Sequence, residues 1–199
     1  VGGLTVTQGG SGAAPSCGVA LSNLVYCWGL NIDGRIGNAQ NGPTPVPAPV
    51  VVAGSNVYKA VSAGSTHTCA LTTTSEAVCW GSIGAPPSGE FVRLESGGGT
   101  CGQREDGTLT CWSNGDVDFT PPSGAFADFS IGLNHACGVR DAGTGECWGK
   151  DLGYGETSVP ARLFRQLSAG GLFTCGIAID GEVVCWGDGH LGQTNVPPL

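Results

Sequence analysis

The chain has 199 residues, of which 12% are charged, and its formal net charge is −8 at pH 7. Its eight lysines and arginines supply no basic face to replace phosphate counterions, which excludes nucleic acid as a partner. No apolar run approaches the roughly 18 residues of a membrane span. The 36 glycines and 12 prolines, which follow no collagen period, favour tight turns between short strands.

Along the chain, the ten cysteines fall into five pairs whose members are ten residues apart. The pairs are Cys17 and Cys27, Cys69 and Cys79, Cys101 and Cys111, Cys137 and Cys147, and Cys175 and Cys185. A tryptophan follows the second cysteine of every pair, and we expect it in the core of its repeat: Trp28, Trp80, Trp112, Trp148 and Trp186. These are all the tryptophans of the chain, so the pattern indicates an internal repeat. Four copies also share a glycine five residues before the first cysteine: Gly12, Gly64, Gly132 and Gly170.

Each cysteine pair frames a predicted β-hairpin. Residues 69–79 place apolar side chains at both ends of a polar middle, which is typical of two strands around a turn. Two copies, 101–111 and 175–185, have Asp-Gly at the turn, a strong hairpin signal. Alternation in residues 164–169 predicts a further strand upstream. We therefore expect each repeat to hold three or four short antiparallel strands.

We expect a single repeat domain over residues 1–199. Its repeats are placed at residues 1–38, 54–85, 90–120, 125–157 and 162–199. Residues 39–53 form a proline-rich insert, in which every second residue from 43 to 49 is Pro. Such a run is stiff and extended, so we expect it outside the repeat core and exposed. Its candidate O-glycosylation positions are Pro43, Thr44, Pro45, Pro47 and Pro49.

The cysteine spacing also predicts covalent structure. If each turn is centred, the paired cysteines face each other on adjacent strands, with Cβ atoms about 4.5–5.5 Å apart, near the range that a disulfide closes. We therefore expect five disulfides, each within one repeat, and an extracellular or cell-surface location. The spacing does not suit zinc, so no metal site is predicted. The chain begins without Met, as expected of a processed secretory protein or of a fragment of a longer one.

Several segments resemble the repeat of the regulator-of-chromosome-condensation family. These are residues 62–71 followed by 79–81, residues 28–37 and residues 186–193. The cysteine-bearing version resembles the ectodomain repeats of Crinkly-type plant receptor kinases and secreted repeat proteins of bacteria and algae. The resemblance implies an all-β fold, in which five hairpin repeats form a β-propeller or an open propeller-like superhelix. The family's propellers commonly have seven blades, whereas this chain has five repeats, and the family's nucleotide exchange on a nuclear GTPase does not carry over.

The histidines do not form a catalytic set. His67 and His135 both lie two residues before a first cysteine, where Pro15 and Phe173 stand in other copies. A position that accepts Phe and Pro is structural. His190 lies alone in a glycine-rich turn, where we expect it to be solvated. No nucleophile, acid or base can be named, and we expect no enzyme activity and no cofactor.

These observations favour a non-catalytic extracellular structural or interaction module, such as the subunit of a self-assembling surface fibre or an adhesive ectodomain. The alternative is a monomeric closed propeller that binds a protein or a glycan through loops at one face. In the first case the chain joins itself head-to-tail by strand pairing, with candidate assembly edges at Leu4, Val6, Val196 and Leu199. The low lysine content favours it, because edge lysines guard against such pairing.

Overall fold

A computed structural model describes residues 5–12, 15–115 and 117–197, which form five antiparallel sheets. The first contains β1 (Val6–Ser11), β2 (Pro15–Ala20), β3 (Val25–Gly29) and β4 (Val46–Val51). The second contains β5 (Tyr58–Ala63), β6 (His67–Thr72) and β7 (Ala77–Gly81), and the third β8 (Arg93–Ser96), β9 (Thr100–Gln103) and β10 (Leu109–Trp112). The fourth contains β11 (Asp128–Ile131), β12 (His135–Val139) and β13 (Gly145–Gly149), and the fifth β14 (Phe164–Ala169), β15 (Phe173–Ala178) and β16 (Val183–Gly187). The prediction of an all-β fold built from five hairpin repeats is confirmed.

Helical structure is minor in the described residues. A short 3-10 turn, η1 (Ile32–Gly34), follows the first hairpin. In the part of the chain that the structure covers, no helix has the length and apolar character needed to cross a membrane.

The cysteine pairs lie directly opposite each other within their sheets. In β15 and β16, for example, Cys175 pairs in register with Cys185. All five pairs form a disulfide, with Cα–Cα distances of 4.0–4.1 Å. Glycine allows the tight reversal of the chain at the two Asp-Gly turns. Gly107 and Gly181 adopt φ angles of 82° and 92° there, a conformation that residues with a side chain rarely adopt. The last three hairpins thus have a glycine with positive φ at the turn, the first two have Asn23 and Ser75 there, and all five are closed by a disulfide.

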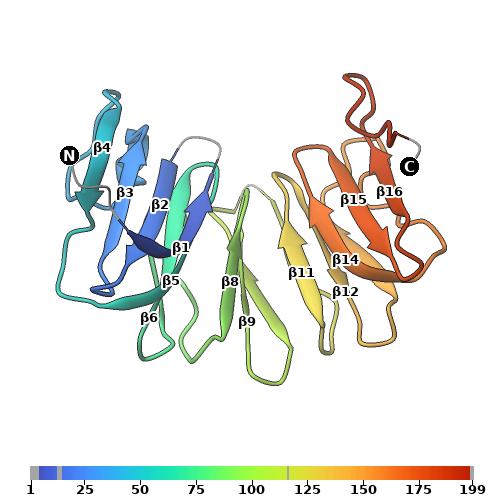
Figure 1. The fold of residues 1–199 in the computed structure, drawn as a ribbon, viewed down its shortest axis with the longest axis horizontal. Helices are drawn as coiled ribbons and strands as arrows, with labels where there is room; N and C mark the ends of the chain where they lie inside the picture. Colours follow the sequence, from blue (N-terminus) through green and yellow to red (C-terminus); the bar gives the residue numbers. More distant parts are fainter. Residues whose placement is uncertain (1–4, 13–14, 116, 198–199) are drawn as a thin grey trace.

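The sheets stand side by side in chain order. Their first strands, β1, β5, β8, β11 and β14, contact one another in that sequence. Figure 1 shows these strands as a row across the molecule, with β4 at one end and β16 at the other. The described residues therefore form an open array, and the first and fifth sheets lie at its two ends.

The proline-rich insert contributes the fourth strand of the first sheet. Strand β4 pairs with β3 through Val46, Val50 and Val51. The prolines of the insert are exposed, and Pro47 and Pro49 lack the N–H that a central strand would need, so an edge position suits them. The prolines of the insert are thus exposed, but the expectation that the insert lies outside the repeat core is wrong for β4, because Val46 and Val50 pair with β3 and pack against the core.

Candidate functional site

The hydrophobic cores of this molecule lie between neighbouring sheets. The first cluster joins Cys17, Val19 and Val25 of the first sheet to Tyr58 and Val61 of the second. Three further clusters join the second sheet to the third, the third to the fourth and the fourth to the fifth in the same way. Each sheet thus has a rear face, which carries its first cysteine and the residue two positions later, and a front face, which covers the rear face of the sheet before it.

An aromatic residue begins the front face of four sheets. Tyr58, Phe91, Phe126 and Phe164 are at most 4% exposed. Each ring lies 5.3–6.2 Å from the tryptophan ring of its own repeat. Trp112, Trp148 and Trp186 are buried and Trp28 and Trp80 are half-buried. Trp80, Trp112, Trp148 and Trp186 therefore pack with these aromatics in the seams between sheets, whereas the first repeat has Val6 in place of the aromatic.

Main-chain hydrogen bonds join successive sheets at the turns that follow their first strands. The N–H of Ser65 donates to Gly97 at 2.8 Å, that of Gly98 to Gly132 at 2.8 Å, and that of Leu133 to the carbonyl of Gly170 at 3.2 Å. Glycine is required because the backbones approach closely: a Cβ on Gly132 would lie 2.2 Å from the carbonyl oxygen of Gly170. The glycines thus set the spacing of the array.

Side chains add a second set of links, which the sequence analysis did not identify. The amide of Gln8 accepts the N–H of Val61 at 2.7 Å and donates to its carbonyl at 3.0 Å. Further along, Ser62 Oγ accepts the N–H of Ser96 at 2.9 Å, and Ser130 Oγ accepts that of Ala169 at 3.1 Å. The signal was available, because Ser62 and Ser130 both lie seven residues before a first cysteine.

Between the third and fourth sheets an arginine makes the corresponding contact. Arg93 donates to Asp128 at 2.6 Å and to the main-chain carbonyl of Phe129 at 3.1 Å. Its guanidinium also lies over the Phe129 ring, 4.7 Å from the centroid. Every seam thus contains a polar side chain from the earlier sheet bonded to the first strand of the next.

Two histidines are buried in the seams and are neutral at pH 7. His67 Nε2 shares a hydrogen bond of 2.7 Å with Thr100 Oγ1, and His135 Nε2 shares one of 2.7 Å with Thr174 Oγ1. Burial, with a smaller contribution from the charge of Arg35, lowers the pKa of His67 to about 4. Burial also lowers the pKa of His135. Each histidine spans two sheets inside the protein, and neither lies beside a nucleophile.

A buried carboxylate closes the loop between β13 and the fifth sheet. Glu156 has no exposed surface, and its two carboxylate oxygens accept the N–H groups of Leu152 at 2.7 Å and Tyr154 at 3.2 Å. Its main-chain carbonyl accepts the indole N–H of Trp186 at 3.1 Å. The N–H of Gly153 and other local donors lower the pKa of nearby Asp151 to about 2. Local donors satisfy both carboxylates, so the two side chains hold the loop in place. The lowered pKa makes Asp151 a poor proton acceptor at neutral pH.

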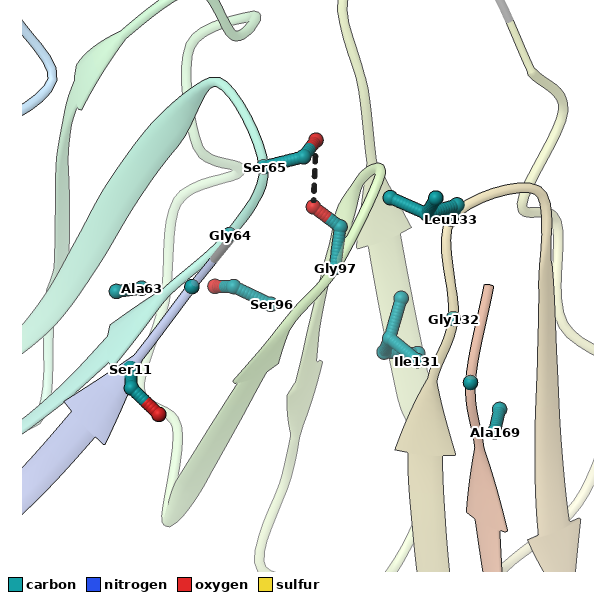
Figure 2. Close-up of a pocket in the computed structure, with 12 residues that line it drawn as sticks. Ser11, Ala63, Gly64, Ser65, Ser96, Gly97, Ile131, Gly132, Leu133 and Ala169 are labelled. Carbon is teal, nitrogen blue, oxygen red and sulfur yellow. Dashed lines mark hydrogen bonds between the residues drawn. The ribbon is translucent and has the colours of Figure 1, made fainter. Parts of the chain in front are cut away.

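The turns of the first strands border a pocket of about 320 Å³. Figure 2 shows that its walls come from successive sheets. A glycine from every sheet lines it: Gly12, Gly64, Gly97, Gly132 and Gly170. The other lining residues are serines and apolar side chains, with Leu133 the largest that is exposed. None of the lining residues carries a titratable side chain, so the pocket offers hydrogen-bonding groups and apolar surface.

The sequence-predicted assembly residues are distributed unevenly. Val6 lies on β1 and is 43% exposed. Val196 is 40% exposed and lies in no strand of the described residues, and its role as an assembly edge stays a prediction. Leu4 and Leu199 lie outside the described residues. Repeats within the chain join through their faces, whereas the sequence analysis expected copies to join through strand edges.

No group of three or more histidine, cysteine or acidic side chains able to hold a metal occurs in the described residues. The candidate O-glycosylation positions of the insert are all exposed. The pocket at the glycine turns and the two end faces of the array are candidate surfaces for a partner.

Known repeats match the chain in two places. Residues 22–71 and residues 164–193 match the family model of the regulator of chromosome condensation (RCC1) repeat. These are RCC1-type repeats. Their occurrence in the first and last parts of the chain agrees with the resemblance drawn from the cysteine and tryptophan pattern.

Solved structures similar to this chain include two plant receptor ectodomains. The CRINKLY WD40 ectodomain of the Arabidopsis thaliana receptor kinase ACR4 is 27% identical with a TM-score of 0.72, and the match covers 96% of this chain and 65% of that one. The ectodomain of the Physcomitrella patens receptor kinase CR4 is 30% identical with a TM-score of 0.76, covering 99% of this chain and 56% of that one. Yeast RCC1 (Prp20), solved bound to Kap60, shares the fold with a TM-score of 0.76 at 14% identity, covering 95% of this chain and 57% of that one. The chain therefore spans between 56% and 65% of the length of these proteins.

Proposed function

We propose that this chain is a non-catalytic, extracellular protein-interaction module. The observation that carries the proposal is the pocket at the glycine turns, which five sheets build together from hydrogen-bonding groups and apolar side chains without a titratable group. Such a surface can bind a partner, but its lining has no titratable acid or base to activate the serine hydroxyls. The likeness to two receptor ectodomains, at 27% and 30% identity, supports a role in binding outside the cell.

The five disulfides support the same location. They are stable in oxidising compartments and are rare where thiols are kept reduced. An adhesive ectodomain and a subunit of a surface fibre are both forms of this role, and they differ in whether the partner is another protein or another copy of the chain. A glycan partner is the alternative that the experiment must separate.

Binding of the labelled chain to the surface of its source cells tests the proposal. Saturable binding should disappear after the cells are treated with protease and should survive treatment with glycosidases. Leu133→Asp, in the pocket, should weaken binding at least tenfold. The matched control is Leu21→Asp, which changes a side chain that is 74% exposed in the turn between β2 and β3. Loss of binding after glycosidase treatment, or equal binding by the two variants, would contradict the proposal.

A further inference from the structure

The fifth sheet carries a rear face of the same kind as the four that are covered within the chain. Ile177 lies two residues after the first cysteine of its pair and is 39% exposed. Its counterparts Val19, Leu71 and Val139 are at most 2% exposed, because the next sheet packs on them. Val183, on the neighbouring strand, is also 39% exposed. The fifth sheet thus presents an apolar residue at a position that the first, second and fourth sheets bury, and that the half-buried Gln103 occupies in the third.

The front face of the first sheet covers no other sheet of the described residues. Val6 takes the place that Tyr58, Phe91, Phe126 and Phe164 take in the other sheets. It is 43% exposed, whereas the aromatics are buried. Val6 packs over Gly18 of its own sheet, as Phe126 packs over Gly138 and Phe164 over Gly176. The front face is therefore formed in the first sheet, with a smaller residue at its head.

The polar groups of the two end faces correspond in register. Gln166 pairs with Ile177 as Gln8 pairs with Val19. Ser168 pairs with Cys175 as Ser62 pairs with Cys69 and Ser130 with Cys137. Gln166 and Ser168 are exposed, whereas Gln8, Ser62 and Ser130 bond the next sheet.

The first sheet carries main-chain groups that correspond to the hydrogen-bond partners of these side chains. Gly9 pairs with Gly18 as Val61 pairs with Ala70, so its main chain is the counterpart of the group that Gln8 binds. Ser11 pairs with Ser16 as Ala169 pairs with Thr174, and its N–H is the counterpart of the one that Ser130 binds. The two end faces of the array are therefore complementary to each other in both apolar and polar groups.

We propose that the front face of the first sheet of one copy docks on the rear face of the fifth sheet of another. Val6 then covers Ile177, Gln166 bonds the main chain of Gly9, and Ser168 accepts the N–H of Ser11. The occupant is a second copy because the contact continues an interface that the chain already makes four times with this register. Such a contact is head-to-tail and leaves a free face at each end, so it adds copies in a line. The proposal adds a second surface to the proposed function and does not depend on the pocket.

Sedimentation velocity over a range of concentrations tests this contact. The unaltered chain should form dimers and longer species as its concentration rises. Ile177→Asp and Val6→Asp each bury a charge at the contact, so each alone should raise the dissociation constant at least tenfold. The control is Val92→Asp, which alters a side chain that is 54% exposed just before β8 of the third sheet, away from both end faces, and this variant should associate like the unaltered chain.

Mixing the two end-face variants gives the decisive result. Val6→Asp keeps an intact fifth sheet and Ile177→Asp keeps an intact first sheet, so an equimolar mixture should form one-to-one dimers and nothing longer. A chain that stays monomeric at every concentration overturns the proposal, as does a mixture that fails to form dimers. Binding to cells in either case would leave the proposed function standing. Circular dichroism and intact disulfides confirm that each variant is folded.

Discussion

Lowering the pH should destabilise the array through His67. This histidine has no exposed surface, and its pKa is lowered to about 4 in the folded chain from its ordinary value of 6.5. Between these two values the unfolded chain binds more protons, so the stability that neutral His67 contributes is present above pH 6.5 and is lost as the pH falls toward 4. The loss amounts to ~2 kcal/mol at pH 5 and ~3 kcal/mol at pH 4.

The matched variant is His67→Phe. Phe173 occupies the same place in the fifth repeat, and its ring lies against Gly170 as the His67 ring lies against Gly64. The variant loses the hydrogen bond to Thr100, which costs about 1 kcal/mol at pH 7, but it removes the titrating group.

Urea unfolding at pH 7 and pH 5, with disulfides intact, measures the difference. Both proteins should carry His135→Phe, because burial lowers the pKa of that histidine as well. The protein that retains His67 should lose ~2 kcal/mol more between the two pH values than the variant does. Equal losses in the two proteins would refute the reasoning, because the pH dependence would then arise from other groups.

Gly132→Ala should lower the free energy of unfolding by about 1–3 kcal/mol in urea titrations, because the new Cβ would clash with the carbonyl of Gly170. The control is Gly42→Ala, which should be close to neutral because no atom lies within 4 Å of its Cβ position. Non-reducing peptide mapping should find only disulfides within repeats, and a disulfide between repeats would contradict the predicted pairing. Replacing both Cys101 and Cys111 by Ala should lower the free energy of unfolding by roughly 2–3 kcal/mol, because the disulfide closes a loop between residues ten apart. Intact-mass analysis of the native chain should show added mass that maps to residues 43–49, and a mass equal to that of the sequence would exclude glycosylation there.

The repeat and its hairpins could be predicted because their signals are local. Paired cysteines ten residues apart, the following tryptophan and the Asp-Gly turns all lie within one hairpin. The glycine turns can be predicted in four copies but not at Gly97, because the register of the third repeat is one residue tighter: Ser96 pairs with Thr100, whereas Ala63 pairs with Thr68. Strand β4 was missed because its prolines hid the valines that pair with β3.

Local signals do not predict which face of each hairpin packs against the next repeat. This packing depends on contacts between residues more than 30 positions apart, such as Gln8 with Val61 and His67 with Thr100. A hairpin with apolar residues on both faces does not say which face meets the next repeat. The substitution of Val6 for an aromatic was visible in the sequence, but its meaning required the knowledge that the other four aromatics cover a preceding sheet.

The main-chain links at the glycine turns bear on how the repeats can diverge over evolution. The donor in successive links is Ser65, Gly98 and Leu133, which share no side-chain chemistry. Because the backbone supplies both donor and acceptor, the side chain at the donor position takes no part in the bond. Ser65 and Leu133 can therefore vary without loss of the bond, so selection can alter the lining of the pocket at these two positions while the spacing of the sheets is inherited unchanged. Gly98 cannot vary in this way, because a Cβ there would lie 1.8 Å from the carbonyl oxygen of Leu133.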